Sequence, residues 1–194
     1  MEEQKTDMQL QDNIHGLSKA EKSCFDWLES LVTAVVVVVI VFTVFFRIPQ
    51  VFGPSMLPGL EENDRVVVSC LERNFHQNDI VVVDARGTQL NERIIKRVIA
   101  TEGQTVDIDF ERGVVLVDGQ ELDESAYIEN GITIDGADMQ FPQTVPEGHI
   151  FVLGDNRRVS LDSRDSRVGM IDSRYVMGKV KLVLFPFSHF GIIN

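Results

Sequence analysis

The organisation of this chain follows from the stretch SLVTAVVVVVIVFTVFF, which runs from Ser30 to Phe46 without a charged residue. As a helix these residues would extend roughly 25 Å. Trp27 and Leu28 add an interfacial turn, which brings the segment to the length needed to cross a bilayer. Valine on every face suits lipid better than the one-sided core of a soluble protein. The sequence therefore predicts a transmembrane helix over residues 30–46.

A removable secretory signal and a buried helix of a soluble core are the alternatives to an anchor. The residues that follow, Phe45 to Pro49, offer no small-x-small cleavage site, and the apolar run is longer than a usual signal core. Ser18 and Glu21 have the spacing of a capping box, so the helix is expected to begin there and to end before Pro49. We expect a retained anchor between an N-terminal tail, residues 1–29, and a folded domain, residues 47–194.

The charge balance limits the partners. The formal net charge is −12, and acidic residues outnumber basic ones both before and after the apolar stretch, which argues against nucleic acid. Lys19 and Lys22 precede the span and Arg47 follows it. This small excess favours an N-terminus inside the cell and a domain outside it. Histidines and cysteines occur singly, so we expect no metal and no cofactor.

After Pro58 the pattern changes to short runs rich in β-branched residues. One turn signal, Asp118-Gly119, separates two of the later runs and predicts a two-residue hairpin. Strands without alternating long helices indicate a mainly β, antiparallel domain. The segment 123–146, rich in turn formers and acids, is expected to be a peripheral excursion. The predicted strands are 65–69, 80–84, 93–100, 106–110, 113–117, 149–153 and 179–185.

Two residues of this domain suggest nucleophilic chemistry. Ser55 follows the apolar stretch by nine residues, which reach at most about 30 Å, so it stays near the membrane. In the predicted strand 93–100, Lys96 shares a face with Ile94 and Val98. Apolar surroundings would lower the pKa of the lysine and leave a neutral amine able to activate a serine. The alternative is a lysine that reaches solvent at the strand edge.

A polar loop, Gly154 to Arg167, follows the predicted strand 149–153 and alternates acids with arginines. Such a run is usually a solvated loop whose ion pairs contribute little. A tight polar loop at a strand end could equally fix the geometry of an active site.

Taken in order, these segments resemble the bacterial type I signal peptidases, membrane-bound serine proteases that remove signal peptides from exported proteins. The motifs that carry the resemblance follow the anchor and cover most of the chain from Ser30 to Phe185. They are Gly-Pro-Ser-Met-Leu-Pro at 53–58, Asn-Asp-Ile-Val-Val at 78–82, Ile-Lys-Arg-Val-Ile at 95–99 and Gly-Asp-Asn-Arg at 154–157 with Ser-Leu-Asp-Ser-Arg at 160–164.

The resemblance implies a Ser/Lys dyad, with Ser55 as nucleophile and Lys96 as general base. It also implies that Ser160 orients the lysine amine and that Asp162 and Arg164 form a supporting pair. Shallow pockets for small side chains, as in Ala-x-Ala, are implied at Val51, Phe52, Met56, Leu60, Ile94 and Ile95.

The implied function is a serine endopeptidase that cleaves preproteins at the outer face of the cytoplasmic membrane. The implied partners are signal peptides and the lipid bilayer. The chain departs from the family pattern at Gly53, where some relatives carry a serine, and at Arg158-Val159. A non-enzymatic, membrane-anchored β domain of the envelope or secretion machinery is the alternative function.

Overall fold

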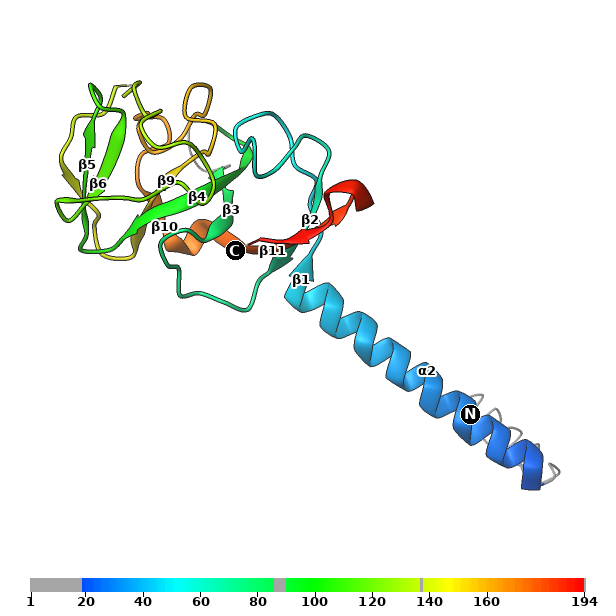
Figure 1. Cartoon of the computed structure of the whole chain (residues 1–194). Coiled ribbons are helices and arrows are strands. Elements are labelled where there is room, and N and C mark those ends of the chain that lie inside the picture. Colours follow the sequence, from blue (N-terminus) through cyan, green and yellow to red (C-terminus); the bar gives the residue numbers. More distant parts are fainter. Residues whose placement is uncertain (1–18, 86–89, 137, 194) are drawn as a thin grey trace. The chain divides into compact units, whose positions relative to one another are not determined.

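The computed structural model describes residues 19–85, 90–136 and 138–193 (Figure 1). The chain divides into two compact units, and the second begins at Phe45. The first unit contributes a helix, and the second contributes the β-strands.

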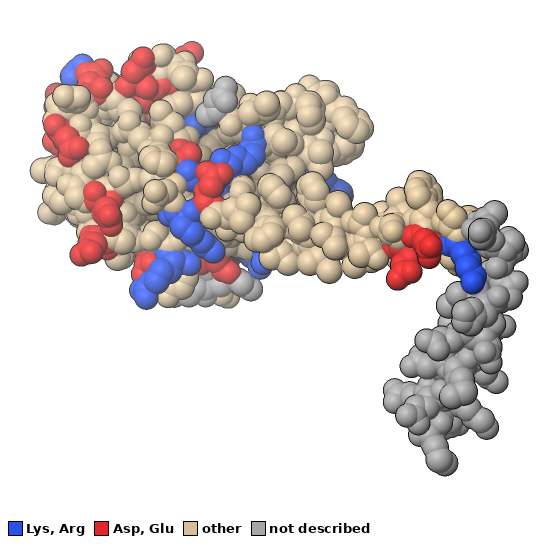
Figure 2. Space-filling model, turned by 90° about the horizontal axis from the view of Figure 1, so that it is seen from below, with Lys and Arg blue, Asp and Glu red and all other residues tan. Residues whose placement is uncertain are grey.

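Helix α2 spans Lys19–Phe45. Among the described residues it alone is long and apolar enough to cross a membrane, and the candidate span is Lys22–Phe45. Its apolar side chains face outward, and Figure 2 shows an uncharged surface along most of the helix. Each of two hydroxyls, on Ser30 and Thr43, donates to a carbonyl one turn earlier, which satisfies them within the helix as a bilayer requires.

The bounds of this helix differ in two ways from those expected. Phe46, predicted as the last residue of the span, is instead the first residue of strand β1, because its backbone pairs with Ser69. Ser18 of the predicted capping box lies outside the described residues. The helix ends before Pro49, as expected.

A large antiparallel sheet forms most of the β domain, and its strand order is β1-β2-β11-β3-β4-β9-β10, with β12 paired to β11. Three predicted ranges coincide with β2, β3 and β9, whereas β4 is one residue longer and β11 begins three residues earlier than predicted. The strands of this sheet are β1 (Phe46–Arg47), β2 (Arg65–Ser69), β3 (Ile80–Asp84), β4 (Arg93–Thr101), β9 (His149–Leu153), β10 (Ile171–Asp172), β11 (Val176–Phe185) and β12 (Gly191–Ile192). Two short 3-10 helices, η2 (Ser173–Tyr175) and η3 (Phe187–His189), flank β11.

A second sheet has the order β7-β6-β5-β8, and Figure 1 shows β5 and β6 at one end of the β domain. Its strands are β5 (Thr105–Asp109), β6 (Val114–Val117), β7 (Gln120–Glu121) and β8 (Gln143–Thr144). Asp118 and Gly119 join β6 to β7 with φ of 54° and 76°. Positive φ at both turn residues is the backbone that a two-residue hairpin needs, so the predicted hairpin is present.

The segment 123–146 is more closely integrated than a peripheral excursion. Ile128 and Val145 are buried, and β8 pairs with β5. Glu124 is only 2% exposed because its carboxylate accepts hydrogen bonds from the Arg157 guanidinium. The acidic composition of the segment concealed this role, since the partner lies more than thirty residues further along the chain.

The alternation of β4 divides its side chains between separate cores. Ile94 and Val98 pack in a cluster with Val81 and Val152, whereas Ile95 packs at the edge of a second cluster that contains Met56. Close packing on both faces restricts the movement of the β4 backbone. The side chains of β4 therefore start from well-defined backbone positions.

Candidate active site

Lys96 lies in β4 on the face predicted from the sequence, between the buried residues Ile94 and Val98. The lysine itself is only 3% exposed. Its backbone is held opposite Val81 of β3. Because so little of the lysine is exposed, its amine does not extend into solvent, and the snorkelling alternative is excluded.

Burial lowers the pKa of the Lys96 amine, because the charged form loses its hydration there. Three carboxylates, Asp162, Glu92 and Asp155, act in the opposite direction through their negative charge. Desolvation is the largest of these effects. The site thus favours the neutral amine more than water does.

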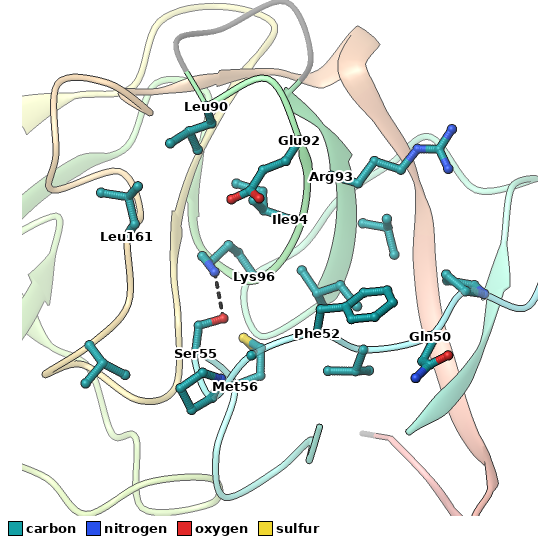
Figure 3. A pocket seen from close by; sticks show the side chains of 17 residues that line it. Gln50, Phe52, Ser55, Met56, Leu90, Glu92, Arg93, Ile94, Lys96 and Leu161 are labelled. Atoms are coloured by element: carbon teal, nitrogen blue, oxygen red, sulfur yellow. Dashed lines mark hydrogen bonds between the residues drawn. The ribbon is translucent and has the colours of Figure 1, made fainter. Parts of the chain in front are cut away.

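Ser55 lies in the loop that runs from Gln50 to Arg65, the first residue of β2. The two ends of this loop are held together by a backbone bridge between Gln50 and Arg65. The Ser55 hydroxyl oxygen Oγ is 2.9 Å from Lys96 Nζ, the donor in this contact, as Figure 3 shows. Gly53 bends the loop with a φ of +76°, a conformation that favours glycine. The two predicted catalytic residues are therefore in direct contact, although 41 positions separate them.

Hydrogen bonds join the Ser55 loop to the Gly154–Arg167 loop. Asn156 donates from its backbone N–H to the Ser55 carbonyl at 3.0 Å and from Nδ2 to the Pro54 carbonyl at 3.1 Å. At Gly154 an added Cβ would lie 2.6 Å from the Ser55 carbonyl oxygen. This close approach requires glycine. The polar loop therefore positions the serine and is more than a solvated run of charges.

Arg97 and Asp155 join the strand of the lysine to the same loop. The guanidinium donates to both carboxylate oxygens at 2.8 and 2.7 Å, and both side chains are almost completely buried. Tyr127 covers the other side of the guanidinium, with its ring centre 3.9 Å from Arg97 Cζ. Because Arg97 follows Lys96 and Asp155 precedes Asn156, this pair links the positions of base and nucleophile.

Asp162 and Arg164 form a second buried pair, as the resemblance implies. Asp162 accepts from Arg164 Nε at 2.9 Å and from the Gly154 N–H at 3.0 Å. Arg164 also donates to the Arg157 carbonyl at 2.8 Å. The pair therefore holds the turn that supports the Ser55 loop.

The predicted contact of Ser160 is not formed here. Its hydroxyl is buried, but it has no hydrogen-bond partner within the described part of the chain. A Cβ at Gly154 would lie 2.1 Å from this hydroxyl oxygen, so the serine occupies space that the glycine leaves open. The structure brings Ser160 to the back of the site without engaging the lysine amine.

A cavity of about 440 Å³ opens beside Ser55 and Lys96 (Figure 3). Five of the six predicted pocket residues line it, and the sixth, Leu60, is completely buried in the core cluster that contains Met56. Sequence reasoning missed five other lining residues near the dyad. The predicted lining residues are Val51, Phe52, Met56, Ile94 and Ile95, and the missed ones are Leu90, Glu92, Arg93, Val159 and Leu161.

Residues 24–185 match the family model described as signal peptidase, peptidase S26. The chain belongs to this family. Its membrane-anchored serine proteases remove signal peptides from preproteins, so the expected family, the mainly β fold and the enzymatic nature of the chain are confirmed.

Two relatives agree with the family match in their sequences. The chain is 32% identical over 176 residues to signal peptidase I of Bacillus licheniformis, covering 87% of this chain and 92% of that protein. It is 37% identical over 148 residues to the probable signal peptidase I-1 of Synechocystis, covering 71% and 70%. A crystal structure of a signal peptidase I from Enterococcus faecalis superimposes with a TM-score of 0.42 at 29% identity, covering 58% of this chain and 97% of that one.

Proposed function

We propose that this signal peptidase cleaves preproteins with Ser55 as the nucleophile and Lys96 as the general base. The observation that carries the proposal is the 2.9 Å contact between Lys96 Nζ and Ser55 Oγ at the wall of an open, largely apolar cavity. A neutral amine at this distance can accept the hydroxyl proton, whereas a serine without a base is a weak nucleophile.

The reaction then runs through an ester. Ser55 Oγ attacks the carbonyl carbon before the cut while Lys96 takes its proton. The resulting ammonium gives that proton to the leaving amine, which becomes the N-terminus of the mature protein. Water attacks the ester with Lys96 again as base, and the signal peptide leaves with a new carboxylate. The Ser55 N–H is the available oxyanion donor in this loop, since Pro54 has none.

The edge of β4 offers a place for the substrate backbone. Its residues 93–97 pair with β3 on one side, while the ladder to β9 begins only at Arg97. The edge at Ile94–Lys96 is therefore unpaired within the described sheet, and an extended peptide can add there as a strand. Val51 and Ile94 would then face the substrate, and a shallow pocket of this kind favours small side chains before the cut.

The direct experiment is incubation of the detergent-solubilised full chain with a preprotein that carries an Ala-x-Ala site, followed by mass spectrometry of both products. We expect one cut after the second alanine and none with Ser55→Ala. Replacing that alanine by leucine or aspartate should prevent cleavage. A cut that follows large or charged residues equally well would contradict the proposed pocket.

Although the Ser160 hydroxyl has no hydrogen-bond partner in the described structure, we propose that it orients the lysine amine during the reaction. Ser160→Ala should lower kcat by roughly 10–100-fold while the melting temperature stays equal or rises, because a buried hydroxyl without a partner is removed. Ser163→Ala is the matched control. The Ser163 hydroxyl accepts a hydrogen bond from the buried Val152 N–H, so this substitution should lower the melting temperature and leave kcat close to that of wild type. Wild-type turnover in Ser160→Ala would refute the assignment.

The β domain is proposed to lie outside the cytoplasm, on the side where preproteins emerge, with the N-terminus inside. A phosphatase reporter, active only outside the cytoplasm, is expected to be active when fused after Asn194. A reporter that works only in the cytoplasm should be inactive at the same position. The reverse pattern would place the dyad on the wrong side of the membrane.

A further inference from the structure

Three carboxylates act on the Lys96 amine, and two of them already have arginine partners. Asp155 is bound on both oxygens by Arg97, and Asp162 is bound by Arg164. These pairs are buried and hold the loop behind the site. Their fields at Lys96 are therefore partly compensated, and changing either would disturb the structure as well.

Glu92 is the third carboxylate and differs from the other two. It lies in the bend directly before β4, two residues before Ile94 and four before Lys96. It lines the same cavity, and Figure 3 shows its carboxylate directed toward the space above the lysine. No hydrogen bond or ion pair joins its carboxylate to another side chain in the described parts of the chain, and the residue is exposed.

Within the described ranges, the other charged side chains near Lys96 either point away from it or form ion pairs. The side chain of Arg93 is directed away from the lysine in Figure 3, Arg97 holds Asp155, and Arg157 holds Glu124. Residues 53–60 of the Ser55 loop carry no charge, and Val81 faces Lys96 from β3. Among the described residues near Lys96, Glu92 is therefore the charged group without an ion-pair partner, and it lines the same cavity as the lysine.

We propose, on the basis of the Ser/Lys function above, that Glu92 is an electrostatic positioning residue that sets the pH at which Lys96 becomes an active base. Its negative charge stabilises the ammonium form, in opposition to burial. Glu92 also keeps the amine basic enough to take the serine proton once it is neutral. A free carboxylate at the cavity rim can do this without contributing to the fold.

The consequence has a defined sign. Burial lowers the pKa of the Lys96 amine, and the charge of Glu92 raises it. Glu92→Gln removes that charge, so the amine should lose its proton at lower pH. The acidic limb of the profile of kcat/KM against pH should move to lower pH. At a pH on that limb the variant should be roughly threefold faster than wild type, and on the plateau it should be equal or slower because the base is weaker.

The test measures kcat/KM from acidic to alkaline pH for the solubilised full chain, with a peptide that spans an Ala-x-Ala cut. Glu111→Gln, in the exposed turn between β5 and β6, is the matched control and should reproduce the wild-type profile. Added salt should move the wild-type limb in the same direction as Glu92→Gln does, and the variant should respond less. A purely structural role would not move the limb.

Two outcomes would overturn the inference. If the limb of Glu92→Gln coincides with that of wild type or moves to higher pH, Glu92 does not set the working pH. Lys96→Met, measured alongside, separates this failure from failure of the dyad. An inactive Lys96→Met with an unshifted Glu92→Gln refutes only the role of Glu92, whereas an active Lys96→Met refutes the dyad and the inference together.

Discussion

Ser55→Ala and Lys96→Met are each expected to lower cleavage of a preprotein by at least about 10³-fold, and the double variant should be no worse than either one. Residues that act as a unit are strongly non-additive, because loss of one removes the function of the other. Lys96→Arg should not restore activity, because a guanidinium stays protonated and cannot act as a base. The measurement is kcat/KM at the plateau pH.

Stability provides the folding control for these variants. In the folded state the pKa of Lys96 is lowered, so between the folded and the unfolded pKa unfolding lets the lysine take up a proton, and wild-type stability from this group rises with pH there. Lys96→Met removes that penalty. Its melting temperature should equal or exceed that of wild type at neutral pH, with a margin that shrinks at alkaline pH. Appreciable turnover by Lys96→Arg would show that the lysine acts through its charge instead.

Asp155→Asn is expected to cause the largest loss of stability among single changes near the site. It leaves the Arg97 charge buried without compensation, which typically costs about 3–5 kcal/mol. The rate should fall as well, because the pair joins the Lys96 strand to the loop that holds Ser55. Thermal unfolding and kcat of the folded fraction would measure the two effects separately.

Glu121→Gln is the matched control for Asp155→Asn. Glu121 forms an ion pair with Arg112, but both side chains are about half exposed, and exposed pairs of this kind contribute little. Its melting temperature and its rate should stay close to wild type. Equal effects of the two substitutions would mean that the Arg97 pair does not connect the base to the nucleophile.

Local patterns predicted the parts of this protein that depend on neighbouring residues. Alternation placed Lys96 on the face of Ile94 and Val98, and the Asp118-Gly119 signal located a hairpin, because both follow from backbone geometry over a few residues. The helix was evident from its unbroken apolar composition. Its last residue was not, since Phe46 is drawn into β1 by pairing with Ser69.

Contacts over long distances in the sequence could not be predicted in the same way. Asp155 and Asn156 belonged to a recognised motif, but their partners, Arg97 and the Ser55 carbonyl, lie about sixty and a hundred positions away. Leu60 has the same apolar character as the pocket residues, and only the packing shows that it is buried in the core and does not line the cavity. Nothing in the local sequence distinguishes Glu92 from other exposed acids, and only the structure shows that it lines the same cavity as Lys96.

The most direct measurement is the titration of the Lys96 amine by NMR, using lysine labelled at Cε and Lys96→Met to assign the signal. The proposed mechanism predicts that the amine titrates below the range of an ordinary lysine, at the same pH as the acidic limb of kcat/KM. The contradicting result would be an amine that titrates in the ordinary lysine range while the enzyme is fully active several pH units lower. Lys96 would then be charged during catalysis and could not be the base.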